Sequence, residues 1–432
     1  MAKTLIYELP LQTIGGLYNA ATLIPILKSV GVDYLWLPPI YPSTGGTDAY
    51  PEDIKLLGAN APTGLNDFGY GVDDYKAIDG RYGTMADFEL FAQICHEHDI
   101  KILMDLPMNH TSINHLWFLE DPYCYCWSHD ERPNWRNHFN DKPAWAEVPA
   151  DKLTYLREQY SFFKRGPHYL HSFSPAQADL NWFPGDNLST ALVRRFRFIT
   201  EFWMNKGVAG FRLDAVQALN KDLRASSMKF EDLLFSNERA FEVINAVFPS
   251  TADRPRPFLI AEIFDPTFGN IAQKYRENTP VNFTINALLP NMVDESWGVF
   301  KSALSKTVRT TGSAIAVESH DTPRFTSRSG KSTSEILETV LSPNAEAVII
   351  YAGQELGLCN PNLPTDIMAK LDTQFAMQVE AGKLPDNLHA TARANARVML
   401  DLSEWERQSA DPNSSLNVVK CLIKAWKKGW MP

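Results

Sequence analysis

Three acidic residues in this chain are of the type and placement that could break a glycosidic bond. Asp214 lies in GFRLDAV, Glu262 in FLIAEI and Asp321 in ESHDTPR, and each motif ends an apolar, β-branched run. Each acid would therefore stand at the C-terminal tip of a strand, and such tips meet at the mouth of a parallel β-barrel. Cleavage with retention of configuration needs one carboxylate as nucleophile and one carboxylic acid that protonates the leaving oxygen.

The predicted nucleophile is Asp214. Arg212 lies two residues earlier on the same strand, so the two side chains point the same way. A fixed guanidinium there would keep Asp214 ionised and oriented. The predicted general acid/base is Glu262, because it stands in the apolar stretch 260–264 and desolvation raises the pKa of a carboxyl group.

Asp321 is the third predicted site residue, suited to binding sugar hydroxyls and to stabilising positive charge on the ring. His110 and His320 are expected to hydrogen-bond hydroxyls of the same sugar. Each assignment has a structural alternative. An Arg-x-Asp pair is more often an ion pair, a lone Glu in an apolar run is usually a strand end, and His-Asp before Pro-Arg can cap a helix. The three acids together, in order on the fourth, fifth and seventh predicted strands, favour catalysis.

Short apolar runs alternate with longer helical patterns, which predicts an α/β protein built as a (β/α)₈ TIM barrel. Several runs are nearly continuous Ile, Val and Leu, as expected of buried parallel strands. The predicted strands are residues 5–9, 32–37, 100–106, 208–214, 258–263, 281–287, 314–318 and 347–352. The predicted helices are residues 17–29, 85–98, 189–206, 230–247, 271–277, 291–306, 333–341 and 415–428. An open doubly wound sheet would need a Gly-rich phosphate loop after the first strand, and Gly15 and Gly16 alone do not supply one.

Two connections are longer than ordinary βα loops. Residues 109–187 are rich in aromatic residues, Pro and His, and they are predicted to form an inserted subdomain after the third strand. Residues 41–66 form a Gly/Pro/Asn-rich loop on the same barrel face, where binding sites usually lie. The barrel is then predicted from residues 1–108 and 188–400, and residues 401–432 are predicted to be a short C-terminal helical tail.

Composition and charge limit the class of protein. The 432 residues carry a formal net charge of −10, and the 44% hydrophobic and 21% charged fractions are those of an ordinary globular protein. Charges are well mixed, so neither a nucleic-acid partner nor a membrane surface is predicted. The five cysteines follow neither a disulfide nor a zinc pattern, which fits a reducing cytosol. The N-terminus lacks a signal-peptide pattern and no run is long enough to span a membrane, so a cytoplasmic protein is expected.

The motifs resemble those of the α-amylase superfamily of glycoside hydrolases, the family numbered thirteen. MDLPMNHTS (104–112) is similar to its first motif, GFRLDAV (210–216) to the second, AEIFDP (261–266) to the third and ESHDTPRFTSR (318–328) to the fourth. QADLNW (177–182) is similar to the QPDLN signature of the oligo-1,6-glucosidase and α-glucosidase branch. The resemblance spans residues 4–400, and it implies a nucleophile at Asp214, an acid/base at Glu262 and a transition-state stabiliser at Asp321.

The resemblance also implies a tight pocket for one glucose unit, closed by an Asp–Arg clamp on the non-reducing-end hydroxyls. The segment DFGYG supplies Asp67 for the clamp and Tyr70 to stack on the sugar. The segment RANARVM supplies Arg393 and Arg397, and Arg397 is the predicted clamp partner. The structural alternative for this pair is a surface salt bridge.

Four features depart from the family pattern. Ser319 stands where Asn is usual, and Gly71 stands where Asp is usual. The loop QTIGGLYNAAT lacks the acidic calcium-binding run of many relatives, so no cofactor and no bound calcium are predicted, although Asn109 is a calcium ligand in the amylases. The C-terminal β-sandwich of the family is expected to be truncated or missing, because residues 401–432 are too few to form one.

The predicted function is that of a retaining, exo-acting α-glucosidase, which hydrolyses short oligosaccharides or disaccharides through a covalent glucosyl-enzyme. The alternative is a transglucosylase or isomerase that uses the same intermediate, because Ala215 and Val216 follow the nucleophile as in trehalose synthases and amylosucrases. A non-catalytic scaffold protein would usually have a broken triad, which this sequence does not. The expected partner is a small-molecule α-glucoside, and its linkage, its length and the oligomeric state are left open.

Overall fold

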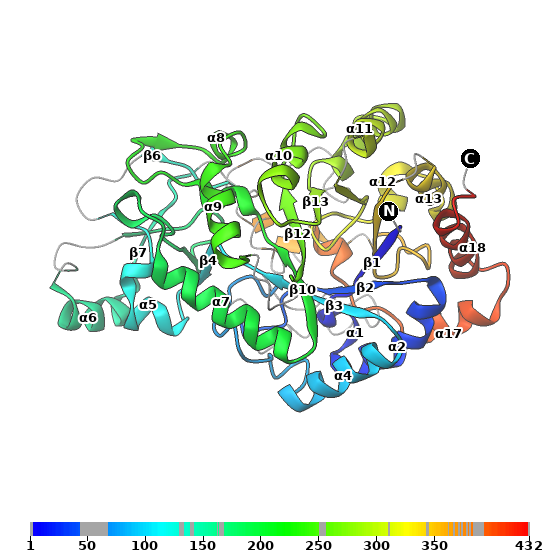
Figure 1. The fold of residues 1–432 in the computed structure, drawn as a ribbon, viewed down its shortest axis with the longest axis horizontal. Coiled ribbons are helices and arrows are strands. Elements are labelled where there is room, and N and C mark those ends of the chain that lie inside the picture. The colour runs from blue at the N-terminus through cyan, green and yellow to red at the C-terminus, as the bar shows by residue number, and fades with distance from the viewer. Residues whose placement is uncertain are drawn as a thin grey trace.

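Eight parallel strands close into a barrel at the centre of the molecule (Figure 1). The computed structural model describes residues 3–43, 68–128, 134–138, 142–161, 163, 168–249, 256–309, 312–342, 345–361, 363–365, 368–369, 372, 375–376, 379, 382 and 393–430. The barrel strands are β1 (Thr4–Glu8), β2 (Tyr34–Leu37), β3 (Lys101–Leu106), β10 (Val208–Leu213), β12 (Phe258–Ile263), β13 (Phe283–Asn286), β14 (Ser313–Ala316) and β15 (Ala347–Tyr351). The ring closes because β1 pairs in parallel with both β2 and β15. Every strand overlaps a predicted run, so the predicted TIM barrel is confirmed.

Helices alternate with the barrel strands along the chain, and most of them cover the outside of the barrel (Figure 1). They are α1 (Leu11–Ile14), α2 (Leu17–Val30), α4 (Met85–Glu97), α7 (Thr190–Asn205), α8 (Phe230–Leu233), α9 (Glu238–Val247), α10 (Asn270–Asn278), α11 (Trp297–Arg309), α12 (Phe325–Ser329), α13 (Thr333–Leu341), α17 (Ser403–Ala410) and α18 (Ser415–Lys427). The start of α4 shows why the sequence folds this way locally. The Thr84 hydroxyl accepts the Asp87 N–H at 3.2 Å, and the Asp87 carboxylate accepts the Thr84 N–H at 2.7 Å, which satisfies two donors at the helix end.

Two predicted helices differ from the structure in extent. The single helix predicted over residues 230–247 is wrong, because the Asn237 amide donates to the Leu234 carbonyl and separates α8 from α9. The helix predicted from residue 291 begins later, since residues Leu289–Asp294 form a 3₁₀ helix and the Ser296 hydroxyl accepts the Val299 N–H at the start of α11. In both cases a short polar side chain bonds to nearby backbone and interrupts the helix.

The interior of the barrel is filled by side chains from nearly every strand. They are Ile6, Trp36, Leu103, Ile260, Phe283, Ile285, Ala314, Ala316, Ala347 and Ile349. Gly210 allows β10 to approach β12 at this level, because a Cβ on Gly210 would lie 1.9 Å from the Phe258 carbonyl oxygen. The register of β10 against β3 also shifts between Val208 and Gly210. Strand β10, which carries Arg212, therefore lies close to β12.

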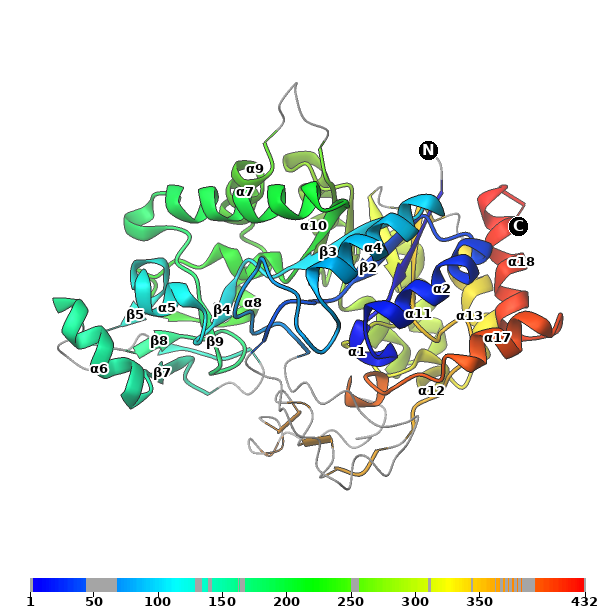
Figure 2. The ribbon, with the colours of Figure 1, turned by 90° about the horizontal axis from the view of Figure 1, so that it is seen from below.

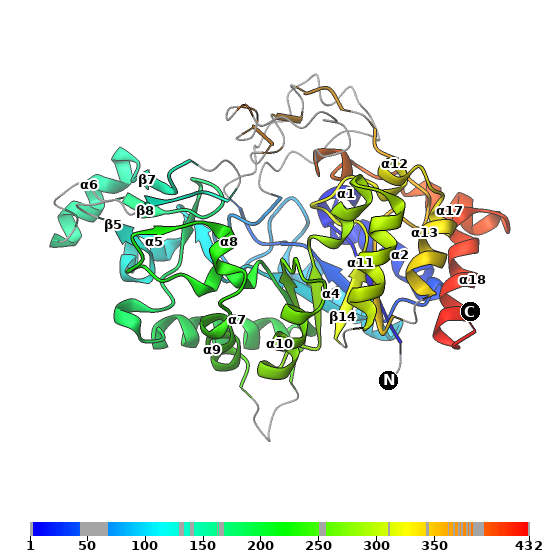
Figure 3. The same ribbon diagram turned by 90° about the horizontal axis from the view of Figure 1, so that it is seen from above.

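Small antiparallel sheets occupy the connection between β3 and β10, at the left of Figure 3. Strand β4 (His110–Ser112) pairs with β9 (Gln177–Asp179), and β8 (His168–Leu170) lies between β5 (Trp127–Ser128) and β7 (Trp145–Glu147). Helices α5 (Leu116–Glu120) and α6 (Ala150–Gln159) belong to the same connection. The pairing of β6 (Asn134–Trp135) with β11 (Ser227–Met228) ties it to the segment after β10.

Helices α17 and α18 pack onto the barrel beside the first helices of the chain (Figure 2). Helix α18 contacts both α13 and α2, so it fills the place between the two. Trp405 and Trp426 are fully buried there. The Trp426 indole donates to the Ala345 carbonyl at 3.2 Å, and Lys3 donates to the Trp426 carbonyl at 2.6 Å. In the part of the chain that the structure describes, no helix has the length and apolar character to cross a membrane.

Candidate active site

Arg212 is the centre of a cluster of carboxylates at the C-terminal ends of the strands. Its Nη1 donates to the two Asp105 oxygens at 2.9 and 3.0 Å and to Asp214 at 2.7 Å. Its Nη2 contacts Glu262 at 2.9 Å, and its side chain is only 1% exposed. A buried guanidinium needs such partners, so Arg212 and the acids fix each other's positions.

The nucleophile and acid predicted from the sequence, Asp214 and Glu262, also share a backbone contact. Ala215, next to Asp214, has a φ of +37°, a left-handed value that is uncommon for a residue with a Cβ. In this conformation the Ala215 N–H donates to Glu262 Oε2 at 3.0 Å. Glu262 is therefore held by a donor on each oxygen, Arg212 on one side and Ala215 on the other.

The environment of Glu262 suits proton transfer near neutral pH. Burial raises the pKa of Glu262 to about 7 against the attraction of Arg212, and the negative charges of Asp214 and Asp321 add to the increase. A carboxyl group with a pKa in this range can both give a proton and take one back.

Asp321 is held by three cationic side chains. Its Oδ1 accepts from Arg393 at 2.9 Å and from Arg397 at 2.7 Å, and its Oδ2 lies 3.0 Å from His320 Nε2. Burial opposes ionisation, but His320 and the two arginines outweigh it and hold the pKa of Asp321 well below its usual range. Its side chain is 33% exposed, so a charged carboxylate faces the site.

His320 lies between two carboxylates and two aromatic rings. Its Nδ1 lies 2.5 Å from Glu8 Oε1, and its ring stacks on Phe68 and Tyr70 with centroids 5.3 and 5.5 Å away. Burial would lower the pKa of His320, but Asp321 and Glu8 raise it to about 9. His320 is therefore a cation at neutral pH.

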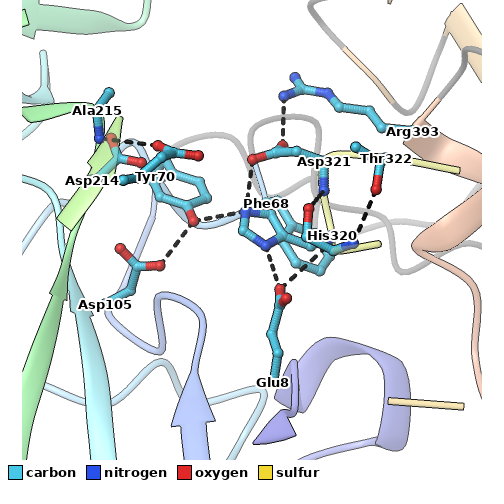
Figure 4. Close-up of polar contacts among 12 residues, drawn as sticks. Glu8, Phe68, Tyr70, Asp105, Asp214, Ala215, His320, Asp321, Thr322 and Arg393 are labelled. Carbon is cyan, nitrogen blue, oxygen red and sulfur yellow. Dashed lines mark hydrogen bonds and ion pairs between the residues drawn. The ribbon is translucent and has the colours of Figure 1, made fainter. Parts of the chain in front are cut away.

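Asp105 completes the base of the site. Its carboxylate accepts from Trp36 Nε1 at 3.2 Å and from the Tyr70 hydroxyl at 2.9 Å, in addition to Arg212. The same Tyr70 hydroxyl lies 2.7 Å from His320 Nε2 (Figure 4). Burial raises the pKa of Asp105 to about 6, although Arg212 opposes the change. Tyr70 thus connects the Arg212 cluster to the His320 cluster.

A cavity of about 360 Å³ lies over these groups, within the range of roughly 300–1,000 Å³ for small-molecule sites. Its polar lining includes Asp214, Glu262, Asp321, Arg212, Arg393, His110, His320, Gln177 and Asn291. Its aromatic lining includes Trp36, Tyr70, Phe173 and Phe264. Charged groups that bind hydroxyls and rings that pack on C–H faces together suit a sugar.

The family model described as "Alpha amylase, catalytic domain" matches residues 12–412. The chain belongs to the α-amylase family. It is 28% identical to an α-glucosidase of Schizosaccharomyces pombe over an alignment of 490 positions, which covers 96% of this chain and 74% of that protein. It is also 28% identical to a trehalose-6-phosphate hydrolase of Bacillus subtilis over 429 residues, which cover 89% of this chain and 69% of that protein.

Solved structures of the family share the fold. A trehalose-6-phosphate hydrolase of Bacillus licheniformis matches with a TM-score of 0.78 at 24% identity, covering 99% of this chain and 83% of that one. The isomaltulose synthase SmuA of Protaminobacter rubrum matches with a TM-score of 0.77 at 22% identity, covering 98% and 83%. The chain is thus a glycoside hydrolase of the α-amylase family, and its relatives act on small α-glucosides.

The structure brings most of the predicted site residues together. Seven of them line the cavity: Tyr70, His110, Arg212, Asp214, Glu262, His320 and Asp321. Arg397 lies behind this layer, where it binds the Asp321 carboxylate and, through Nε, the His320 carbonyl at 2.7 Å. Asp67, its predicted clamp partner, lies outside the described residues.

Sequence reasoning left Glu8 and Asp105 without a role. Glu8 is the last residue of β1 and Asp105 lies near the end of β3, so each resembles the triad in its position on a strand. Applying the strand-end criterion to all eight strands would have found both. The role of Glu8, which is to hold His320, depends on a contact across the barrel that the sequence does not contain.

Ser319 supports the backbone of Asp321. Its hydroxyl accepts the Asp321 N–H at 3.1 Å, and its own N–H donates to the Thr322 hydroxyl at 3.0 Å. This short turn resembles the local bonds that Asn side chains make. The unusual residue therefore still orders the loop that presents Asp321.

Lys221 occupies a set of buried oxygens beside Asn109. Its ammonium contacts the Asn109 side-chain oxygen, Asp179 Oδ2 at 3.1 Å and the Ala218 carbonyl at 2.7 Å. Asn109 and Asp179 are completely buried. Oxygens of this type are calcium ligands, but here they surround a lysine. The residues around Asn109 therefore do not fit a calcium ion.

Proposed function

We propose that this protein is a retaining, exo-acting α-glucosidase that hydrolyses short α-glucosides. The observation that carries the proposal is the binding of Asp214 and Glu262 to one guanidinium, that of Arg212, at 2.7 and 2.9 Å. Sharing one guanidinium keeps the two carboxyl groups close, and retaining enzymes need a closer pair than inverting enzymes do.

In the first step, Asp214 attacks the anomeric carbon and the bond to the leaving oxygen breaks. Glu262 gives its proton to that oxygen, which leaves as a neutral hydroxyl. Arg212 is well placed to orient Asp214 for this attack, because it donates to one of the Asp214 oxygens. The product of this step is a glucosyl ester on Asp214.

In the second step, Glu262 removes a proton from water, which attacks the same carbon and releases Asp214. Two inversions at one carbon give an α-configured product. Asp321 is the group we assign to stabilise positive charge on the ring, because its carboxylate stays ionised and partly exposed.

The charges of the cavity favour a neutral substrate over a phosphorylated one. Phosphate groups are usually bound by Arg or Lys side chains that are available to donate. Within the described lining, the cations are Arg212, Arg393 and His320, and each of them binds carboxylates of the protein. We therefore expect a plain glucoside rather than a sugar phosphate.

Transglucosylation is a second candidate, favoured by the aromatic groups beside Glu262. Phe264, two residues after Glu262, lines the cavity together with Phe173 and His138. Their rings can pack on the C–H face of an acceptor sugar and can exclude water from the glucosyl ester.

The test is proton NMR of the first products formed from maltose, isomaltose, sucrose and trehalose. Early release of α-glucose is expected for a retaining α-glucosidase. Early β-glucose would overturn the retaining mechanism, and a new disaccharide as the main product would favour the second candidate. Turnover of none of the four would overturn the proposed activity.

A single substitution tests whether the activity depends on the proposed nucleophile. Asp214→Asn should lower turnover by more than about 10³-fold, because the neutral amide cannot form the ester. Unchanged circular dichroism would show that the fold survives. Retained turnover would remove Asp214 from the nucleophile role.

A further inference from the structure

We propose that Asn291 determines which leaving or acceptor sugar the enzyme accepts, and that Arg328 holds it in the orientation this requires. The inference rests on the proposed function and goes further, because it assigns the sugar beyond the cleaved bond to one side chain. Asn291 lies in the 3₁₀ helix Leu289–Asp294 that follows β13, and it lines the cavity.

The position of Asn291 places it on the leaving-group side of the site. The leaving oxygen must lie at Glu262, which donates the proton. Glu262 is on β12, and β13 is paired with β12 on the side away from β10. The groups that surround the glucosyl unit in our mechanism, Asp321 and His320, follow β14 instead. A sugar attached to the leaving oxygen can therefore extend toward residues 286–291.

The orientation of the Asn291 amide follows from its partner. Arg328 Nη2 lies 3.2 Å from the oxygen that is assigned as Asn291 Oδ1. A guanidinium only donates, so the amide oxygen must face Arg328 and the NH₂ group must turn away from it. Among the described residues, no acceptor takes these two N–H groups. They are available to a molecule in the cavity.

Arg328 is itself rigidly held. Its Nε and Nη2 bind the two Asp294 oxygens at 3.0 and 2.5 Å, and its side chain is 1% exposed. A bidentate contact of this kind fixes the plane of the guanidinium. Arg328 is the last residue of the motif ESHDTPRFTSR, and the reaction mechanism alone gives it no role.

The chemistry of an uncharged amide selects a class of ligand. Two N–H donors suit a hydroxyl or ring oxygen of a neutral sugar, and they lack the charge that a phosphate requires. The contact lies beyond the cleaved bond, so it acts on disaccharides and is absent when the leaving group is a single atom.

The experiment compares α-D-glucosyl fluoride with whichever of the four disaccharides the wild type cleaves best. Asn291→Asp keeps an oxygen for Arg328 but has no N–H donor, and it should lower kcat/KM for the disaccharide about tenfold. The value for the fluoride should stay within about twofold, because fluoride makes no contact there. Arg328→Lys should produce the same pattern, since it releases the amide.

Glu295→Ala, an exposed substitution one residue beyond the same 3₁₀ helix, is the control and should change neither substrate. An equal loss with both substrates in a variant that melts like wild type would overturn the inference, as would no loss with either. Absence of fluoride turnover in the wild type would overturn the proposed function and this inference with it. If Asn291→Asp melts early, Asn291→Gln provides the second test: it retains the donors at a longer reach and should alter the preference among disaccharides.

Discussion

Glu262 must alternate between an acid and a base, yet in this structure both of its oxygens accept N–H bonds. Those bonds favour the carboxylate, while burial and two neighbouring acids favour the protonated form. The balance puts the pKa of Glu262 at about 7, so the two forms are present in similar amounts at neutrality. The pH dependence of the first step should report this balance.

We predict that kcat/KM for a disaccharide falls as the pH rises through about 7, because the protonated Glu262 is lost. Glu262→Gln should lower the disaccharide rate by about 10²–10⁴-fold and should remove this alkaline limb. The variant should still form the glucosyl ester from α-D-glucosyl fluoride, whose leaving group needs no proton. Rate profiles from pH 5 to 9 on both substrates are the measurement, and an alkaline limb that persists in Glu262→Gln contradicts the assignment.

The sequence predicted the positions of the triad because each acid ends an apolar run, and burial patterns are local. It did not predict which charged side chains bind Asp321 and His320. Arg397 binds Asp321 and the His320 carbonyl, and this contact joins residues 76 positions apart. Glu8 and His320 are 312 positions apart. Such pairs depend on how the barrel closes, so a single sequence contains no direct sign of them.

At the scale of elements, Lys221 connects three parts of the structure. It follows β10 and binds Asn109 after β3 and Asp179 on β9. A buried ammonium of this kind is needed to neutralise Asp179, and removal of one partner leaves the other charge without compensation. The lysine thereby holds the connection between β3 and β10 against the barrel.

We predict that Lys221→Met lowers the free energy of unfolding by about 3–5 kcal/mol. Thermal melting followed by circular dichroism measures the change. Lys206→Met is the matched control, because Lys206 pairs with Glu89 at the surface and should contribute about 1 kcal/mol or less. We propose that no calcium is needed here, so EDTA should leave the wild-type melting temperature unchanged. A marked decrease with EDTA would contradict this.

The strands were predictable because parallel barrel strands are short and almost wholly apolar. The ends of the helices were harder to predict. The interruption between α8 and α9 depends on one amide, that of Asn237, and a periodic pattern continues through it. The same holds for residues 289–296, where local bonds of Ser296 delay the start of α11.

At the scale of the whole molecule, α17 and α18 belong to the layer of helices around the barrel. The sequence predicted a short tail with one helix over residues 415–428, and residues 401–432 are too few for the β-sandwich of the family. The structure instead buries Trp405 against Glu355, whose Oε1 accepts from the Trp405 indole at 2.7 Å and from the Tyr7 hydroxyl at 2.6 Å. The sequence shows that α18 is amphipathic, but it does not show that α18 packs against α2 and α13.

We predict that Trp405→Ala lowers the free energy of unfolding by about 3–5 kcal/mol, through the cavity it leaves and the donor it removes from Glu355. Trp430→Ala is the control, because Trp430 is 68% exposed and should have little effect. Urea unfolding followed by fluorescence compares the two. Equal midpoints for both variants would show that α17 contributes little to the barrel.

The pairing of β1 with β15 has a consequence for how the chain is made. The ring closes between its first and last strands, and Lys3, next to β1, also bonds to Trp426, 423 positions away. During synthesis, β1 can pair with β2 early, but its other edge has no partner until β15 leaves the ribosome. An exposed strand edge is a site for pairing with other chains. Because pairing between distant parts of a chain is slow, we expect closure to be a late step of folding, and we expect nascent chains to be exposed to aggregation until it occurs.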